Sequence, residues 1–518
     1  MVSCLTPRSL QQKMRWILFI IRYLILFCIL LMPGITFAQQ LSLAEVLQIT
    51  LSTHPDIPLG ELQTSSAQIE QERINGMLDP RLSARIGTSD ETRPTTSLFV
   101  ATQTKSSQFS GSVNQPLSDG SSLTGTLNYN RTKLIYPATA PASFQSRLNP
   151  SYSHQIDLTY RYPLLRGHGN PAYHKLLDAA SSDETSARWQ VAMLKEGLAG
   201  QAVTLYYQLV IEELNLNIAT DALSRAEKLL KYQRSREQFG LIEKADRLQA
   251  DALLATREME KSSAEAAVAQ ARTALNRLMS RSGNQTVSPI ANEPVIGTDE
   301  LSQLNVDSLM ASAIEYRPIF SSLKARMAAA NARLNVANDQ HDTQIDLVGQ
   351  IGSRALEDSA GRAFGEGFTL NDRFISVSVE LSDTLNGKAT HADIRQAELA
   401  RQQIMLEKVQ AKESITSELS TLLSRLTYGS KTLKVAEQRV VAESQKFNAE
   451  MQRYREGRSN TAVIVQFEGE LRGAELQAAL QKVSLQMASQ QLKLAEGTLL
   501  TRILDNGTAQ ATAEDIQQ

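Results

Sequence analysis

Apolar and polar residues alternate strictly through SHQIDLTYRY, residues 153–162. Ile156 and Leu158 fall on one face of this segment, whereas Asp157 falls on the other. A two-residue period of this kind predicts a β-strand with one apolar face and one wet face. The sequence Ser118-Asp119-Gly120 predicts a hairpin turn between two further strands. In all, the alternation predicts additional strands at residues 81–87, 108–117, 122–130, 343–351 and 373–381.

Two much longer segments follow the helical period instead. Residues 171–238 and 389–455 carry apolar residues such as Leu198, Ala202 and Leu205 at helical spacing. At 1.5 Å per residue, each predicted helix would be roughly 100 Å long, which is more than a compact domain needs. Each is followed by a glycine turn and a shorter helix, predicted at residues 243–282 and 461–504. The Gly-rich segment 353–372 is expected to be a surface loop.

The chain contains the same arrangement twice. LSLAEVLQITLSTHPDI (41–57) aligns without a gap with LNVDSLMASAIEYRPIF (304–320), including a proline in each. REQFGLIEKADRLQAD (236–251) pairs in the same way with RYREGRSNTAVIVQFE (453–468). Opening helices are predicted at 41–78 and 304–340, so each half consists of a helix, strands, a very long helix, a glycine turn and a helix.

The N-terminal segment has the features of a secretory signal peptide. Basic residues precede the apolar run YLILFCILLM (23–32), and Ala38 offers a small residue at the cleavage position. A membrane anchor is an alternative, but a spanning helix needs about 20 apolar residues. Lipidation at Cys28 is a further alternative, disfavoured by the bulky residue before it. Because both cysteines, Cys4 and Cys28, lie in this segment, the exported chain would have none, which suits a bacterial envelope protein.

Composition excludes several classes of protein. With 518 residues, 42% of them hydrophobic, the chain can bury a large core, and a net charge of −2 gives no reason to expect nucleic acid binding. The RGHGNP segment lacks the lysine of a phosphate-binding loop and is interpreted as a strand-to-helix elbow. We therefore predict no enzyme, no metal and no cofactor, since no helix face carries a pair of histidines at metal-ligand spacing among His54, His154, His168, His174, His341 and His391.

Strands with one apolar and one wet face suit a wall between two solvents. A closed barrel with lipid outside and water inside provides both solvents and leaves no free edge. A soluble antiparallel sheet with one face on a core gives the same alternation and is the alternative. Four to six strands per chain are too few to enclose a channel, so a barrel would require several copies of the chain.

The order and spacing of several motifs resemble the TolC-like outer membrane efflux protein family. They are LSLAEVLQITLSTHPDI, DPRLSARIG, YPLLRGHG and the two glycine turns, and the resemblance covers nearly the whole mature chain. It implies an α+β membrane protein with two internal repeats, in which a homotrimeric outer-membrane β-barrel continues into a long periplasmic α-helical barrel. The chain departs from the family in two respects. Ser382 stands where a proline is usual, and the extra first-half hairpin exceeds the family's usual four strands per chain.

The resemblance also implies a function and partners. The chain would be the passive exit duct of a tripartite efflux pump or type I secretion system, located in the bacterial outer membrane and extending into the periplasm. An inner-membrane transporter would supply energy, and a periplasmic adaptor would dock on the helical tip. The alternatives are a periplasmic coiled-coil scaffold with a soluble β-cap, or an adaptor-like protein, for which no lipoyl-like domain is found.

The chain is accordingly divided into consecutive segments. These are a signal peptide (1–38), an opening helix (39–80), first-half strands (81–165), a helical hairpin (166–282), an inter-repeat equatorial segment (283–303), the second-half helix (304–340), strands (341–388) and hairpin (389–505), and a flexible tail (506–518).

Candidate site residues follow from the same resemblance. The adaptor-docking tip would contain Arg236, Phe239, Gly240, Leu241 and Asp246 from the first glycine turn, and Arg453, Tyr454, Gly457, Arg458 and Ser459 from the second. Family members carry acidic residues after the second turn, where this chain has Val463 and Gln466. The candidate positions for a pore gate are therefore Asp246, Val463, Gln466 and Glu468.

Overall fold

The computed structural model describes residues 39–141, 148–283, 287–290 and 298–501. The predicted signal peptide with both cysteines, part of the inter-repeat segment and the C-terminal tail lie outside the described residues. The helices are α2 (Leu43–Thr53), α3 (Asp56–Asn75), α4 (Pro171–Gln238), α5 (Lys244–Leu278), α6 (Thr298–Gln303), α7 (Val306–Tyr316), α8 (Pro318–His341), α9 (Ala360–Gly367), α10 (Lys388–Arg455) and α11 (Thr461–Glu496). The strands are β1 (Gln39–Leu41), β2 (Arg81–Thr92), β3 (Gln103–Pro116), β4 (Ser122–Ile135), β5 (Ser151–Pro163), β6 (Val287–Pro289), β7 (Gln344–Glu357) and β8 (Arg373–Ser382).

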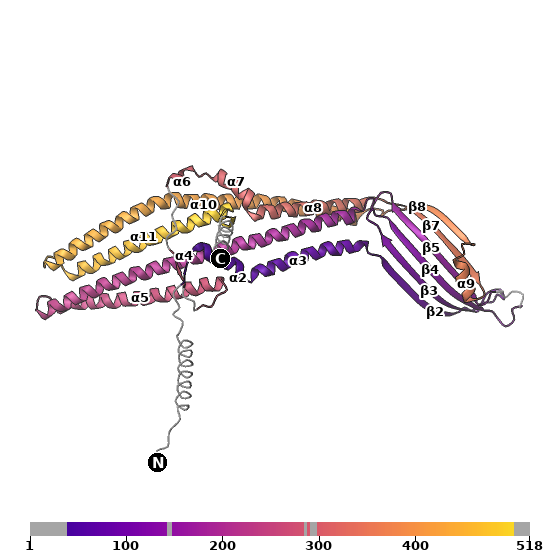
Figure 1. Cartoon of the computed structure of the whole chain (residues 1–518), viewed down its shortest axis with the longest axis horizontal. Helices are drawn as coiled ribbons and strands as arrows, with labels where there is room; N and C mark the ends of the chain where they lie inside the picture. The colour runs from indigo at the N-terminus through magenta and orange to yellow at the C-terminus, as the bar shows by residue number, and fades with distance from the viewer. Residues whose placement is uncertain (1–38, 142–147, 284–286, 291–297, 502–518) are drawn as a thin grey trace, which may run out of the picture.

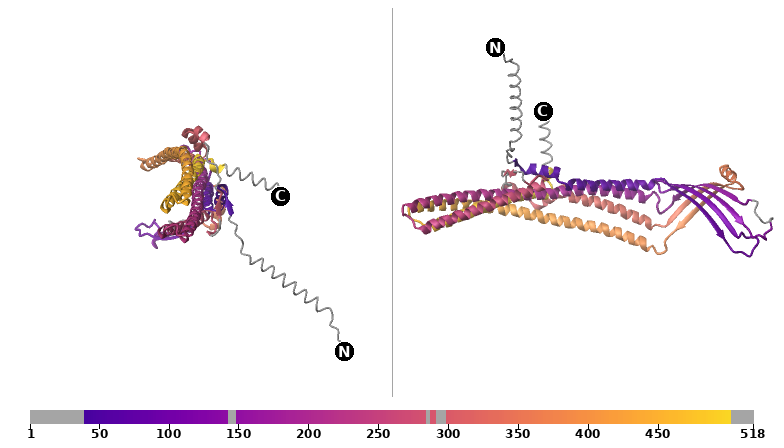
Figure 2. Two further views of the ribbon diagram at one scale, coloured as in Figure 1. Left: turned by 90° about the vertical axis from the view of Figure 1, so that its left-hand side faces the viewer. Right: turned by 90° about the horizontal axis from the view of Figure 1, so that it is seen from below.

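The molecule is elongated, with a sheet at one end and two helical hairpin tips at the other (Figure 1). Helices α4 and α10 are 68 residues each and run most of the length of the helical part. The predicted bounds 171–238 match those of α4. The second long helix was predicted to begin at residue 389, one residue after the observed start of α10 at Lys388. Viewed end-on in Figure 2, the helices form a curved layer rather than a closed bundle.

The internal repeat is visible in the helices that open each half. Each predicted opening helix is broken in two at its proline, giving α2 and α3 at Pro55, and α7 and α8 at Pro318. Proline has no N–H to continue the helical hydrogen bonds and disfavours helical geometry in the residue before it. His54 and Arg317, which precede the two prolines, are both extended. The paired prolines of the sequence alignment thus mark the same structural break.

The main sheet is antiparallel throughout and contains strands from both halves. Its order is β2-β3-β4-β5-β7-β8, so the predicted extra hairpin, β3 and β4, lies in the same sheet as the other strands. Strand β5 pairs with β7 from the other half through Tyr152↔Glu357 to Pro163↔Asp346. This pairing between strands far apart in sequence joins the two repeats at the sheet end of the molecule.

The helical part has its largest apolar core near the middle of its length. Leu43 and Leu47 of α2 pack there with Tyr206 and Leu209 of α4 and with Leu275 of α5. A small parallel sheet formed by β1 and β6 lies beside this core and was not expected from the sequence. The Tyr206 hydroxyl lies 3.2 Å and 3.0 Å from the carbonyl oxygens of Leu41 and Ile290 and so ties both strands to α4.

Part of the segment predicted to be a Gly-rich surface loop forms regular secondary structure. Strand β7 extends through Glu357, and the short helix α9 follows it. Phe364 and Phe368 pack on the ring of His154 of β5, which is 1% exposed. An α9 side chain at Gly367 would collide with that ring, so glycine is required for this close approach.

Candidate functional site

The main sheet has one continuous apolar face. The aligned row Leu82, Val113, Leu158, Ile351 and Ile375 crosses five of its six strands, with Gly125 filling the sixth position on β4. These large side chains are 45–78% exposed, which is unusual for so many neighbouring apolar residues in water. The face therefore needs an apolar surrounding.

The opposite face of the same sheet is polar. Thr124, Thr159 and Ser376 occupy a parallel row there. Nearer the helices, Arg161 forms ion pairs of 2.7 Å with both Asp346 and Glu380, carried by three different strands. Charges that lie side by side and pair across strands are compatible with a hydrated surface and incompatible with a lipid-facing one. The sheet thus presents one apolar face and one polar face.

The RGHGNP segment forms an elbow that joins this sheet to α4. Gly167 and Gly169 have φ angles of +83° and +72°, in the left-handed region that favours glycine. Asn170 caps the helix by accepting a hydrogen bond from the Tyr173 amide at 3.2 Å, and Pro171 occupies the first helical position. This geometry supports the interpretation of the segment as a strand-to-helix elbow.

The two glycine turns at the far end of the helical hairpins have the same geometry. Gly240 and Gly457 have φ angles of +69° and +76°, and each follows the last turn of a 68-residue helix. The Leu241 amide donates to the Arg236 carbonyl at 3.0 Å, and the Arg458 amide donates to the Arg453 carbonyl at 2.9 Å. This six-residue bond is a Schellman C-cap, in which glycine adopts the left-handed conformation. The aligned sequences of the two turns therefore encode one structure.

Several predicted tip residues lie on the surface of these turns. Phe239 and Leu241 are 75% and 62% exposed, and the side chains of Arg453 and Arg458 are 60% and 67% exposed. Tyr454, in contrast, is 3% exposed and lies between the hairpins. In this arrangement Tyr454 cannot present its ring to a partner, so the expectation that it belongs to a docking surface is corrected.

A buried polar cluster joins the two hairpins just behind the tip. The Thr461 hydroxyl of α11 donates to Asp246 of α5 at 2.8 Å and accepts a hydrogen bond from Gln233 of α4 at 2.7 Å. Tyr454 of α10 lies 3.1 Å from the same hydroxyl and also accepts from Gln233. Because the Thr461 proton is directed to Asp246, Tyr454 is the donor toward Thr461. All four helices of the two hairpins meet at this one side chain.

Sequence reasoning identified Asp246 and Tyr454 but missed Gln233 and Thr461. Gln233 and Thr461 are both completely buried, and 228 residues separate them in the chain. Burial raises the pKa of the Tyr454 hydroxyl, so the hydroxyl keeps its proton at physiological pH. The cluster is therefore uncharged apart from Asp246.

The other proposed gate positions differ in their surroundings. Val463 is half-buried, and Gln466 is exposed and donates to Glu470 at 2.8 Å. Glu468 is 2% exposed and accepts hydrogen bonds from Arg257 at 3.2 Å and from Arg225 at 3.3 Å. A carboxylate enclosed by two arginines within the chain cannot face a pore. The expectation for Glu468 is therefore corrected, and the residue instead connects α11 to α4 and α5.

Half-buried carboxyl groups also occur nearer the middle of the helical part. Burial raises the pKa of Glu196, although its 2.7 Å ion pair with Arg317 opposes that effect. Burial likewise raises the pKa of Glu213. A hydrogen bond from Ser288 and the charge of Arg272 oppose this effect of burial. Glu196 thus links α4 to Arg317 at the break between α7 and α8. Glu213 links α4 to Arg272 of α5 and to Ser288 of β6.

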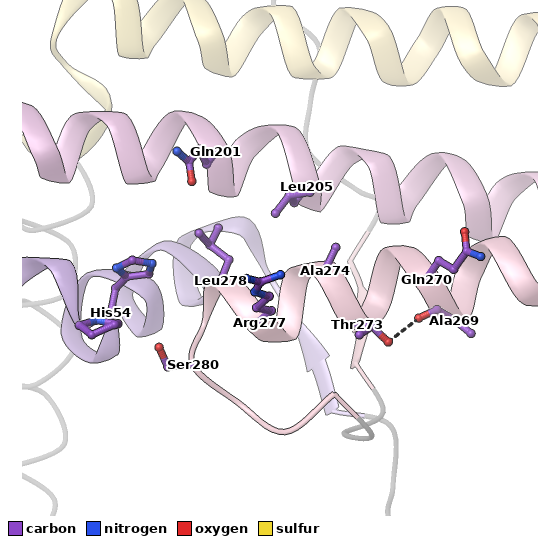
Figure 3. A pocket seen from close by; sticks show the side chains of 11 residues that line it. His54, Gln201, Leu205, Ala269, Gln270, Thr273, Ala274, Arg277, Leu278 and Ser280 are labelled. Carbon is purple, nitrogen blue, oxygen red and sulfur yellow. Dashed lines mark hydrogen bonds between the residues drawn. The ribbon is translucent and has the colours of Figure 1, made fainter.

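A cavity of about 850 Å³ lies between α4, α5 and the end of α2. Figure 3 shows Gln201 and Leu205 on one side of this cavity and Arg277 and His54 on the other. His54 lies 3.7 Å from Asp56. The residues that line the cavity include no nucleophile and base in hydrogen-bond reach of each other. The cavity has the character of an open groove between helices.

Metal-binding side chains do not gather in the described part of the chain. Within residues 39–141, 148–283, 287–290 and 298–501, no group of three or more His, Cys, Asp or Glu residues could hold a metal ion. His341 and His391 do lie together, with ring centroids 4.4 Å apart, a proximity that their sequence spacing did not reveal. Over the same described residues, no helix is both long enough and apolar enough to span a membrane.

The fold is that of solved outer-membrane channels. The structure matches the outer-membrane channel OprN with a TM-score of 0.63 at 18% identity, covering 88% of this chain and 90% of that one. It matches the outer membrane protein VceC from Vibrio cholerae with a TM-score of 0.61 at 16% identity, covering 88% and 96% of the two chains. The CmeC outer membrane channel of Campylobacter jejuni gives 0.61 at 13% identity, with 88% and 86% covered.

These similarities confirm the sequence resemblance at the level of the fold. The helix-rich architecture with an antiparallel sheet is shared over most of the length of both partners in each comparison. No protein-family model matches the chain, and no curated protein matches it.

Proposed function

We propose that the chain is one subunit of a passive outer-membrane export channel. The observation that carries this proposal is the two-faced sheet. Large apolar side chains on one face of the sheet are 45–78% exposed, and the other face carries ion pairs between side chains of neighbouring strands. The sheet adjoins helices that are long enough to cross a periplasm. A wall between lipid and a water-filled lumen satisfies both faces at once.

The functional unit in this proposal is a homotrimer. Six strands cannot close around a water-filled lumen, because even eight strands leave an interior filled by side chains. Additional copies would also cover the helices, where α10 exposes Leu399, Leu406 and Val409 by 54–70%. Three copies follow from the resemblance to TolC-like channels, as do an inner-membrane transporter and a periplasmic adaptor.

The hairpin tips would form the periplasmic entrance. Phe239 and Leu241, with Arg453 and Arg458, supply an exposed apolar and basic surface for adaptor docking. The cluster around Thr461 lies directly behind this surface and holds the two hairpins together. Adaptor binding would separate the hairpins, break these hydrogen bonds and open the entrance, with no chemical step along the way.

Glycine substitutions at the turns test this proposal. A Cβ at Gly240 or Gly457 would meet no atom within 4 Å, so Gly240→Glu and Gly457→Glu leave the packing intact. The cost of a non-glycine residue at positive φ is about 1–2 kcal/mol, which a large assembly tolerates. We expect both variants to reach the outer membrane as heat-resistant oligomers and to lose export.

Gly473→Glu is the matched control for Gly457→Glu, because Gly473 lies in the same hairpin as Gly457, is exposed, and also has open space around its Cβ position. It should retain export. Export at the wild-type level in Gly240→Glu and Gly457→Glu would refute adaptor docking at the tip. Recovery of the wild-type protein as a soluble periplasmic monomer would refute the channel itself and favour the scaffold with a soluble β-cap.

A further inference from the structure

The hairpin formed by β3 and β4 is built into the middle of the main sheet. β2 pairs with β3 along its whole length, from Arg81↔Asn114 to Thr92↔Gln103. β4 in turn pairs with β5 from Ser122↔Arg161 to Thr132↔Ser151. β2 and β5, which would be neighbours without the hairpin, are therefore separated by two full strands.

The hairpin has the same two faces as the strands on either side. Phe109 and Val113 of β3 and Leu127 of β4 lie on the apolar face, continuous with Leu158 and Ile351. Their immediate neighbours Ser110, Ser112, Thr126 and Asn128 lie on the polar face. A hairpin that projected into a lumen or into solvent would be wet on both sides, so this alternation identifies β3 and β4 as part of the wall.

The hairpin is also fastened to the elbow that leads into α4. The Gly169 amide donates to the Asp119 carbonyl at 3.1 Å, and the Asn170 side chain donates to the Leu117 carbonyl at 3.3 Å. Gly120, with a φ of +89°, lies so close to the Gly167 carbonyl that a Cβ there would collide with it. These contacts fix the helix-side end of the hairpin at the same level as the ends of the other strands.

The two edges of the sheet are complementary to each other. In the described part of the chain, β2 and β8 each pair on one side only. β2 leaves the helical end and β8 returns to it, so β8 of one copy would lie antiparallel to β2 of the next. Ile375, Val377 and Val379 of β8 are 65–72% exposed and would continue the apolar face onto Leu82 and Ile86 of β2.

We infer that the assembled barrel contains eighteen strands, six from each of three copies, closed by pairing β8 of one copy with β2 of the next. This inference rests on the proposed trimeric channel and adds the width of its wall. With strands about 4.8 Å apart and tilted by about 40°, eighteen strands give a backbone diameter of roughly 36 Å. Twelve strands, the number without β3 and β4, give roughly 24 Å, so the hairpin roughly doubles the cross-section of the lumen.

Pairs of engineered cysteines, in a background without the native cysteines, distinguish a barrel of eighteen strands from one of twelve strands. Leu82 and Val113 are register partners and lie within disulfide reach, whereas Leu82 and Leu158 are three strand spacings, about 14 Å, apart. We expect Leu82→Cys with Val113→Cys to form an intrachain disulfide in outer membranes, and Leu82→Cys with Leu158→Cys to form none. A wall without β3 and β4 would bring Leu82 and Leu158 together and reverse this result.

A second set of pairs tests closure between copies. Val377→Cys is combined in turn with a cysteine at Leu82, Ala84, Ile86 or Thr88, all on the apolar face of β2. We expect at least one combination to give disulfide-linked dimers and trimers. If these form but Leu82→Cys also links to Leu158→Cys, the eighteen-strand wall is wrong and the channel proposal stands. If no combination links the copies and the protein is recovered from the soluble periplasmic fraction, the channel proposal fails as well.

Discussion

Thr461→Val removes the one hydroxyl that connects all four helices behind the tip, with almost no change in side-chain volume. Thr461 donates to the Asp246 carboxylate at 2.8 Å and accepts from Gln233 and Tyr454 at 2.7 and 3.1 Å. Valine can do neither, so three buried or half-buried polar groups lose a partner. In the proposed closed entrance these bonds join the first hairpin to the second, and in the proposed open entrance they would be absent. The substitution therefore weakens the closed state selectively.

The size of the effect follows from the types of bond that are lost. A hydrogen bond to a charged group contributes about 1.5–3 kcal/mol and a neutral one about 0.5–1.5 kcal/mol. Asp246 is only half-buried and can be rehydrated, and Gln233 keeps its bond to Tyr454, so the lower ends of these ranges apply. The closed state then loses about 2–3 kcal/mol per chain, which multiplies the open population roughly 30- to 150-fold per chain.

Single-channel recording of the purified oligomer in a planar bilayer measures this change directly. Thr461→Val should show long-lived high-conductance openings without any adaptor, and cells carrying it should become sensitive to large antibiotics that the outer membrane normally excludes. Thr461→Ser keeps the hydroxyl and should behave like the wild type. If Thr461→Val and Thr461→Ser give the same conductance as the wild type while both form heat-resistant oligomers, the Thr461 cluster does not hold the entrance closed.

Three further changes test other parts of the structure. Glu468→Gln breaks a buried ion pair and should cost about 3 kcal/mol, lowering the temperature at which the oligomer dissociates on gels but leaving its conductance unchanged; altered ion selectivity would instead restore a pore-facing role. Since burial raises the pKa of Glu213, the folded state binds this proton more tightly than the unfolded state, so stability is lost as pH rises through that pKa; Glu213→Gln should be more stable than wild type at pH 8, and the difference should vanish below about pH 4 in thermal melts. Gly367→Ala should displace α9 from His154 and expose the segment before β8 to proteases on intact cells, whereas Gly361→Ala, with open space around it, should not.

The sequence predicted the long elements closely because their signals are local. The 171–238 helix coincides with α4, since a proline and an asparagine cap define its start and a glycine turn defines its end. β3 was predicted to begin at residue 108 but begins at Gln103, because its first residues are polar on both faces. Contacts between polar side chains of neighbouring strands stabilise these first residues, such as the 3.0 Å ion pair between Lys105 and Asp90. Periodicity does not reveal a strand whose two faces are both wet.

The parts of the site that the sequence did not predict depend on partners distant in the chain. Glu468 was assigned to a pore gate from its distance to the second glycine turn, and only the fold shows that Arg257 reaches it across 211 residues. The same holds for Gln233 and Thr461, which are ordinary helical residues until the hairpins are packed. Local sequence pattern thus predicts the long helices and the strands, whereas predicting the contacts between the hairpins requires the tertiary structure.

In the proposed gating, the contact face of α11 would let the hairpins separate and close again in one register. Thr461, Glu468 and Glu475 follow one another at intervals of seven residues, and each hydrogen-bonds to the first hairpin, the last through Arg225 at 3.0 Å. Ile464 and Leu471 lie between them and are buried against the same hairpin. This is a heptad pattern with polar residues at one core position and apolar residues at the other, and polar core residues favour a single register at the expense of stability. Separating such a seam exposes less apolar surface than separating a fully apolar one, and the outermost layer, at Thr461, is the first that an adaptor would have to break.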